Sequence, residues 1–186
     1  MCERCGWAKT ELSIAYHDAE WCVPLHDDQK LFEMLILEGM QAGLTWELIL
    51  KRREAMREAF DGFDPVKIAA YDETRLEELK ANPELIRNRL KLAALPVNAK
   101  AFLKVREEYG SFDAYIWQFV DGQQIINHWR NMAEMPAEDD LSRRISKDLK
   151  KRGFKFVGPT ICYSFMQGIG LIDDHVIDCP WHTDSR

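Results

Sequence analysis

Helix start signals recur along the 186-residue chain, whereas the alternating pattern of a β-strand is almost absent. Asp64 precedes Pro65, and Asn82 precedes Pro83. In each pair a capping side chain stands directly before a proline, and proline suits the first turn of a helix. Apolar positions at spacings of three and four extend this pattern, which predicts an all-α protein of about eight helices, broken or kinked at Pro96.

The charge of the chain is concentrated in one segment. The whole sequence carries a net charge of −6, yet residues 142–155 hold seven basic side chains and one aspartate. This segment is therefore +6, and the rest of the chain is −12. A basic run is often only the solvated face of a helix, but it is also what a protein needs to bind nucleic-acid phosphates.

The sequence has no segment suited to a membrane. Nowhere do 18 apolar residues follow one another, and the first residues, MCERCGWAK, are polar where a secretory signal needs an apolar run. Five cysteines are an odd number, which argues against a framework of disulfides. We expect a cytoplasmic protein whose cysteines are buried thiols or metal ligands.

The segment KKRGFKFVGPTICYSF, at residues 150–165, follows the basic run and contains two glycines between two predicted helices. Gly153 suits a left-handed helix C-cap, and Gly158 precedes Pro159, so the first amides of the next helix are unshielded. Amides at a helix N-terminus bind anions, and DNA phosphate is an anion that such a hairpin can bind without recognising sequence. The alternative is a tight turn between two packed helices.

Glu38 lies within an otherwise apolar run, MLILEGMQAGLTW, at residues 34–46. It shares a helical stripe with Leu31, Leu35 and Ala42, which points its carboxylate inward. No basic residue lies at helical spacing from it, and an unpaired carboxylate is costly to bury. Such a group is paired by another part of the chain, protonated, or reserved for a ligand.

Four candidate metal ligands lie near the two ends of the chain: Cys5, His17, His175 and Cys179. Two thiolates and two imidazoles suit a closed tetrahedral zinc site, which is structural because it leaves no position for water. Spacing alone leaves buried thiols and a surface histidine as the alternative. Cys2 and His182 are possible substitutes within the set.

Six stretches of the sequence form one set: CGW at 5–7, AYHDAEWCVP at 15–24, KLFEMLILEGMQAGLTW at 30–46, FDPVKIAA at 63–70, KKRGFKFVGPTICYSFMQ at 150–167 and DHV at 174–176. As a set they resemble the bacterial type I 3-methyladenine DNA glycosylases, which belong to the helix-hairpin-helix superfamily. The stretches run from near the first residue to near the last. The resemblance therefore implies a single glycosylase unit over residues 1–186, with two helical lobes sharing a base pocket.

The resemblance implies a helix-hairpin-helix glycosylase fold with its hairpin at about residues 150–167 and its two chain ends tied by a zinc ion on the four ligands. It also implies a base-excision repair enzyme that hydrolyses the N-glycosidic bond of 3-methyladenine in alkylated double-stranded DNA. Relatives that cut the strand carry a lysine after the hairpin glycine, where this chain has Pro159 and Thr160. We therefore expect the strand to stay uncut, and the enzyme to act as a monomer.

The resemblance assigns roles to individual residues, with Glu38 as the catalytic and base-recognising group. The expected walls of the base pocket are aromatic: Trp7, Tyr16, Trp21 and Trp46. The expected DNA contacts are Gly43, Leu44, Gly153, Lys155 and Gly158. Because methylation at N3 makes the base cationic, electron-rich rings favour it over neutral adenine.

Two residues complicate this interpretation. Cys22 stands where the family favours glycine, so the backbone beside Trp21 has fewer conformations open to it. Asp173 loosely matches an aspartate that other helix-hairpin-helix glycosylases require, although the type I family does not depend on it. Two other functions share the same features: a protein that recognises alkylated DNA without releasing a base, and a zinc-stabilised interaction module without a role on DNA.

Overall fold

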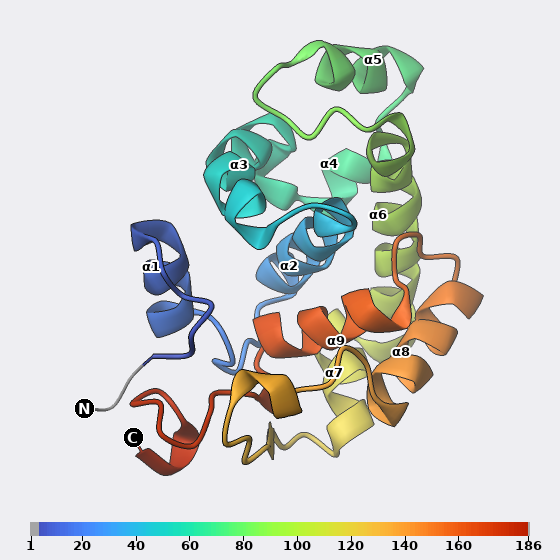
Figure 1. The fold of residues 1–186 in the computed structure, drawn as a ribbon. Coiled ribbons are helices and arrows are strands. Elements are labelled where there is room, and N and C mark those ends of the chain that lie inside the picture. Colours follow the sequence, from blue (N-terminus) through green and yellow to red (C-terminus); the bar gives the residue numbers. More distant parts are fainter. Residues whose placement is uncertain (1–3, 186) are drawn as a thin grey trace.

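Polar caps start most helices of the structure, a computed structural model that describes residues 4–185 (Figure 1). The α-helices of this part are α1 (Glu11–Ala19), α2 (Asp28–Gln41), α3 (Trp46–Ala59), α4 (Pro65–Ala69), α5 (Glu73–Ala81), α6 (Arg89–Tyr109), α7 (Phe112–Trp117), α8 (Asp140–Lys151) and α9 (Pro159–Gly168). Shorter elements lie between them: η1 (Asp61–Phe63), η2 (Gln118–Val120), β1 (Ile125–Ile126), η3 (Met132–Glu134), β2 (Ile172–Asp173) and η4 (Thr183–Ser185). The predicted helical class is confirmed.

The capping predictions succeed at one proline and fail at another. Asp64 caps α4 as predicted, because its Oδ1 accepts a hydrogen bond from the Val66 amide at 2.8 Å. Asn82 does not start a helix: it follows the last residue of α5 and accepts a bond from the Glu84 amide at 3.0 Å. The same side chain that caps a helix can also close a local turn, and here the turn forms.

Pro96 does not break α6, which runs without interruption from Arg89 to Tyr109. A proline inside a helix removes one backbone donor and crowds the preceding turn. Pro96 itself is buried, as are Leu95 and Ala99 on either side of it, and the packing of this face of the helix offsets that loss. The predicted break was therefore wrong, and its alternative, a kink at Pro96, stays a prediction.

Helix α2 is the central element of the fold. It contacts α3, α6, α7 and α9, and every residue from Leu31 to Met40 is buried. In Figure 1 it lies between the long helix α6 on one side and α1 on the other. Because the helix is enclosed on all sides, two glutamates, Glu33 and Glu38, are buried together with its apolar residues.

The two ends of the chain lie close together (Figure 1). Strands β1 and β2 form a parallel pair, with Ile125 opposite Ile172 and Ile126 opposite Asp173, and this pair anchors the C-terminal segment. The hydrophobic core is continuous from Cys5 to Cys179, so the two-lobe division stays a prediction, as does the monomeric state. Among the described helices none is both long and apolar enough to cross a membrane.

Candidate base pocket and metal centre

The carboxyl group of Glu38 is buried without a partner. Only 4% of the residue is exposed, and within residues 4–185 its carboxylate makes no hydrogen bond or ion pair. Burial raises the pKa of this carboxyl from its usual 4.5 to about 8. Glu33, on the same helix, is instead held by Arg53 and Arg57 at 2.7 and 2.6 Å. The protein therefore neutralises one buried glutamate of α2 and leaves the other for a ligand.

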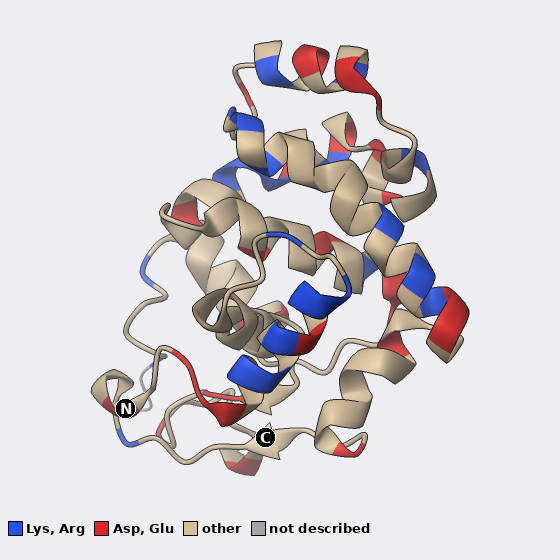
Figure 2. Ribbon diagram, turned by 90° about the vertical axis from the view of Figure 1, so that its right-hand side faces the viewer, with Lys and Arg blue, Asp and Glu red and all other residues tan. Residues whose placement is uncertain are grey.

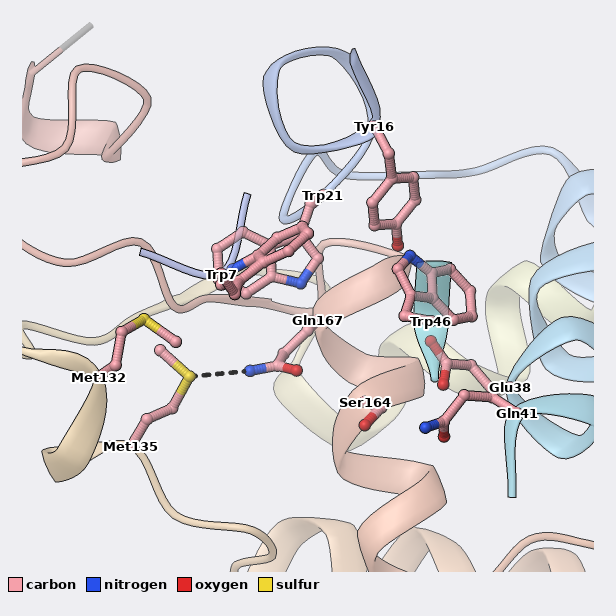
Figure 3. Close-up of a pocket in the computed structure, with 10 residues that line it drawn as sticks. All are labelled: Trp7, Tyr16, Trp21, Glu38, Gln41, Trp46, Met132, Met135, Ser164 and Gln167. Atoms are coloured by element: carbon pink, nitrogen blue, oxygen red, sulfur yellow. Dashed lines mark hydrogen bonds between the residues drawn. The ribbon is translucent and has the colours of Figure 1, made fainter. Parts of the chain in front are cut away.

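Glu38 faces a cavity of about 260 Å³. The lining residues come from distant parts of the chain: Trp7, Tyr16, Trp21, Glu38, Gln41, Trp46, Met132, Met135, Ser164 and Gln167. Figure 3 shows the Glu38 carboxylate beside the Trp46 ring, with Trp7 and Trp21 on the far side. The structure thus brings Glu38 and all four predicted aromatic residues to one cavity.

Flat aromatic faces form most of the cavity wall. The ring centroids of Tyr16 and Trp46 lie 5.2 Å apart, and those of Trp7 and Trp21 lie 5.0 Å apart. The indole Nε1 of Trp46 is buried and has no hydrogen-bond partner in the described part of the chain. The cavity therefore presents stacking surfaces and one unpaired carboxyl, which suits a flat, cationic, hydrogen-bonding ligand.

A tight turn connects α2 to Trp46 at the edge of the cavity. The Gln41 side chain donates to the Leu44 carbonyl at 2.7 Å and so closes the turn. Gly43 has a φ of +74°, and no described atom lies within 4 Å of where its Cβ would stand. Gly43 and Leu44 do not line the cavity themselves, so their predicted contact with DNA stays a prediction.

The hairpin between α8 and α9 has the predicted backbone geometry. Gly153 adopts a φ of +94°, its amide donates to the Lys150 carbonyl at 3.0 Å, and the Phe154 amide donates to Leu149 at 3.1 Å. These two bonds form a Schellman cap. At Gly158, α9 starts without a side-chain cap from any described residue, and the space around the glycine is open. The first amides of α9 are therefore available to an anion.

The basic segment is less free than its sequence indicated. Figure 2 shows blue ribbon along α8 and the turn that follows it. Arg152, however, is paired with Asp148 and Glu108, each at 2.7 Å, and Arg143 is paired with Glu138 and Asp140. The other five basic residues of this segment have no ion pair with any described residue: Arg144, Lys147, Lys150, Lys151 and Lys155. These five are the ones available to phosphates.

Three of the four predicted metal ligands form one buried cluster. The ligand atoms of Cys5, His17 and Cys179 all lie within 4.8 Å of one another, and the cluster joins the two ends of the chain. The Nε2 atom of His17 is 3.7 Å from the Cys179 sulfur, and its Nδ1 is 2.8 Å from a carboxylate oxygen of Asp18. A carboxylate behind a histidine is a common support for a metal ligand.

His175, the fourth predicted ligand, lies beside this cluster. Its ring centroid is 4.8 Å from that of His17, and its Nε2 is buried without a partner in the described chain. Its Nδ1 is 2.7 Å from Asp173, whose other oxygen accepts from Thr183. Two thiols and two carboxylate-supported imidazoles make a donor set that fits a structural zinc ion.

The structure argues against the alternative roles of two described residues, His182 as a metal ligand and Asp173 as a catalytic group. The ring nitrogens of His182 are used by the Asn127 carbonyl at 2.9 Å and the Asp184 amide at 3.1 Å, so His182 is not free to replace a ligand. Cys2 lies outside the described residues. Asp173 supports His175 and does not line the cavity, which removes the geometric basis for a catalytic role.

Comparison with known proteins decides the family. A sequence model described as methyladenine glycosylase matches residues 7–183. The chain belongs to this family. It is 49% identical to DNA-3-methyladenine glycosylase 1 of Escherichia coli (strain K12), over 99% of each chain. It is 47% identical to DNA-3-methyladenine glycosylase of Haemophilus influenzae (strain ATCC 51907 / DSM 11121 / KW20 / Rd), over 98% of this chain and all of the relative.

A solved structure shares the fold. It is a Tyr-to-Phe variant of 3-methyladenine DNA glycosylase I in complex with 3-methyladenine, with a TM-score of 0.94 and 37% identity over 98% of each chain. The predicted family, its glycosylase class and the helical fold with linked chain ends are therefore confirmed.

Five residues of the methyladenine glycosylase pocket were not predicted to line it: Gln41, Met132, Met135, Ser164 and Gln167. Ser164 and Gln167 are polar, three positions apart on apolar α9, and this spacing was the signal available in the sequence. The Gln167 amide donates to Asp174 at 2.8 Å, which turns its carbonyl oxygen towards the cavity (Figure 3). The two methionines come from an irregular segment, and no sequence pattern places them here.

The backbone at Cys22 adopts a conformation that suits glycine, the residue that the resemblance led us to expect there. It adopts a φ of +60°, the left-handed region in which a side chain is strained. Its carbonyl accepts from Gln124 at 2.8 Å, its amide donates to the Gln167 carbonyl at 2.9 Å, and its sulfur accepts from the Asp174 amide at 3.3 Å. These bonds hold the strained residue in place.

Replacing Glu38 with glutamine should change how stability depends on pH. Between about pH 4.5 and 8 the folded state keeps a proton on Glu38 that the unfolded state has lost, so stability falls as pH rises through this window. The free energy of unfolding of the wild-type protein should fall by on the order of 3 kcal/mol up to pH 8 through this one group, and Glu38→Gln should not show that fall. Urea unfolding at pH 5 and pH 8 measures it, with exposed Glu77→Gln as control. An unchanged pH slope in Glu38→Gln would contradict the assignment.

Proposed function

We propose that this methyladenine glycosylase removes 3-methyladenine from alkylated DNA by hydrolysing its N-glycosidic bond, with Glu38 as the residue that recognises the base. One observation carries the proposal: a buried, unpaired carboxyl faces an aromatic cavity. The relatives named above are DNA-3-methyladenine glycosylases, and one related structure holds 3-methyladenine. The remaining steps follow from the chemistry of the pocket.

The pocket favours a cationic base through its aromatic walls. An enzyme that acts on a base in duplex DNA takes that base out of the stack, and aromatic faces replace the lost stacking. Methylation at N3 gives the nucleotide a positive charge, and a cation over an indole or phenol ring gains about 0.5 to 2 kcal/mol. Trp46 and Tyr16 stand beside Glu38 and supply such faces. Neutral adenine gains less from the same rings.

The protonation state of Glu38 adds to this selectivity. Its raised pKa keeps the carboxyl largely neutral at pH 7 in the empty pocket. A cationic base lowers that pKa again, because an opposite charge favours the ionised form. The resulting carboxylate accepts a hydrogen bond from the exocyclic amine of the base.

The chemical step needs little acid catalysis. The methylated base departs as a neutral molecule, so no proton has to be delivered to it, while the sugar develops positive charge. A carboxylate held in a low-dielectric pocket stabilises that charge without reorganisation. No lysine of the described chain lines the cavity, so no amine is placed to attack the sugar. The product is an abasic site in an uncut strand.

Release of free base tests the activity and the role of Glu38. Wild-type protein incubated with methylated duplex DNA should release 3-methyladenine and leave the strand uncut until alkali treatment. Glu38→Gln and Trp46→Ala should each slow release by about a hundredfold. Chromatography of the released bases and gels of the strand measure both effects.

The control for this experiment is Glu77→Gln, the same chemical change on exposed α5, which should keep wild-type activity. Tight binding of methylated DNA without any released base would instead support a recognition protein. Full activity in Glu38→Gln and Trp46→Ala would remove the proposed roles of these residues.

We also propose that the hairpin grips the DNA backbone at Gly153, Lys155 and Gly158. Open amides at the start of α9 and the unpaired ammonium group of Lys155 support this role. Phosphate contacts of this kind do not read sequence, which suits an enzyme that must inspect damage anywhere. Arg152 serves the fold instead, since its charge is already paired.

Removal of Lys155 should weaken DNA binding and its salt dependence together. Each lost phosphate contact lowers the slope of log affinity against log salt by about one. We expect this change for Lys155→Ala, and none for Lys80→Ala, which removes a lysine of α5 that is paired with Glu77. Fluorescence anisotropy with labelled duplex at several salt concentrations measures the slope. Equal slopes for wild type and Lys155→Ala would exclude this contact.

We further propose that Cys5, His17, His175 and Cys179 hold a structural zinc ion. The closed donor set and the unpaired Nε2 of His175 support it. When bound, zinc supplies a cross-link between chain ends rather than chemistry on the substrate, because four protein ligands leave no position for water. In a chain-entropy model, a cross-link over so long a loop contributes about 4 to 5 kcal/mol.

Metal removal should therefore lower the melting temperature. A strong chelator should destabilise the wild-type protein and have no further effect on His175→Ala, which is already destabilised. His128→Ala, at an exposed histidine, is the matched control and should respond to the chelator as the wild type does. Differential scanning calorimetry with elemental analysis for zinc measures the effect. A zinc-free protein of unchanged stability would overturn the site.

A further inference from the structure

Two polar side chains are buried on one face of α6. Lys91 is 7% exposed and Asn98 is 5% exposed. They are seven positions apart, about two helical turns, so they lie on the same side of the helix. A buried polar group is costly unless it is hydrogen-bonded. Each of these two side chains is hydrogen-bonded to the backbone of a different segment.

Lys91 holds the end of α2. Its Nζ donates to the Met40 carbonyl at 2.8 Å and to the Ala42 carbonyl at 2.6 Å. These carbonyls belong to the last turn of the helix that carries Glu38, where an ammonium group satisfies free acceptors and the negative end of the helix dipole. The bonds fix the start of the turn that runs through Gly43 to Trp46.

Asn98 holds the hairpin. Its Oδ1 accepts from the Lys155 amide at 2.7 Å, and its Nδ2 donates to the Lys155 carbonyl at 3.1 Å. The side chain thus pairs with both backbone groups of one residue, as a neighbouring strand would. Lys155 lies between the two hairpin glycines. Its ammonium group is the one that we assign to a DNA phosphate.

The hairpin also packs directly on α2 between these bonds. Phe156, next to Lys155, has a φ of +57° and packs on Gly39 of α2, where a Cβ would come within 3.3 Å of the Phe156 Cβ. A narrow crevice between α2, α6 and the hairpin is lined by Gly39, Lys91, Asn98 and Phe156. A strained phenylalanine persists only where its surroundings hold it, and here the neighbouring Lys155 backbone is held by Asn98.

We propose that Lys91 and Asn98 are positioning residues, which fix the spacing between the turn at residues 41–46 and the hairpin so that both fit one DNA duplex. The proposal rests on the proposed glycosylase function. In duplex DNA, the gap that a flipped base leaves in the stack lies at a fixed distance from the backbone phosphates. Loops held at that distance before binding lose less freedom on binding.

The test for Asn98 compares DNA binding with base binding. We expect Asn98→Ala to weaken duplex affinity about tenfold and to lower the salt slope by about one, as Lys155→Ala does. Binding of free 3-methyladenine, followed by tryptophan fluorescence, should stay unchanged because the pocket is not touched. Asn98→Asp keeps the size of the side chain but opposes the Lys155 carbonyl with a carboxylate oxygen, and it should act in the same direction.

The test for Lys91 compares two substrates. Lys91→Met keeps the stem of the side chain and removes both bonds to the end of α2. Excision from alkylated duplex should fall about tenfold relative to excision from alkylated single strand, in which no gap has to be filled. Val105→Ala, a buried truncation on the same helix without a bond to either loop, should lower stability and leave this ratio and the salt slope unchanged.

The outcomes separate this proposal from the proposed function. If wild-type protein releases 3-methyladenine while the Asn98 variants keep the wild-type salt slope and Lys91→Met keeps the wild-type ratio, the positioning role is wrong and the glycosylase assignment stands. If Val105→Ala shows the same losses, the effects are general instability, and the proposal is overturned as well. Failure of the wild-type protein to release any base would remove the function itself.

Discussion

The candidate base pocket depends on one costly arrangement, a carboxyl group buried without a partner on the central helix. Neighbours on every side enclose α2, and burial raises the pKa of Glu38 to about 8. The same helix shows how the chain treats a glutamate with no functional task, because Arg53 and Arg57 neutralise Glu33. The packing of the core keeps the Glu38 carboxyl buried although it has no partner. A ligand with a positive charge pairs with the ionised carboxylate and so offsets part of the cost of burial.

The metal cluster and the base pocket share one segment of the chain. His17, a predicted metal ligand, follows Tyr16, and its ring lies 5.4 Å from Trp7 and 5.6 Å from Trp21. Trp7 and Trp21 form one wall of the cavity, while Tyr16 stands beside Trp46 on the side of α2. A tie between the chain ends therefore fixes the N-terminal wall against the rest of the pocket, without any contact with the substrate.

Sequence reasoning succeeded where a residue's own chemistry sets its place. The inward direction of Glu38, the cap at Asp64 and the left-handed Gly153 all follow from local rules. It failed at Asn82 and Pro96, where a competing turn and the burial of α6 decided. Met132 and Met135 line the cavity with residues from distant parts of the chain, and the Lys91 and Asn98 side chains bond residues 49 and 57 positions away. No local pattern contains that information.

Selectivity in such a pocket has to come from charge rather than shape, because a single methyl group changes the fit of a purine by only about 1 to 3 kcal/mol. A cation gains twice here, from aromatic faces and from a carboxyl that ionises when the cation arrives. Neutral adenine has the same exocyclic amine, yet it must either leave Glu38 protonated or bear the cost of a buried charge. The cationic base therefore gains the attraction of an ionised Glu38, whereas the undamaged base leaves the carboxyl protonated and forgoes that attraction.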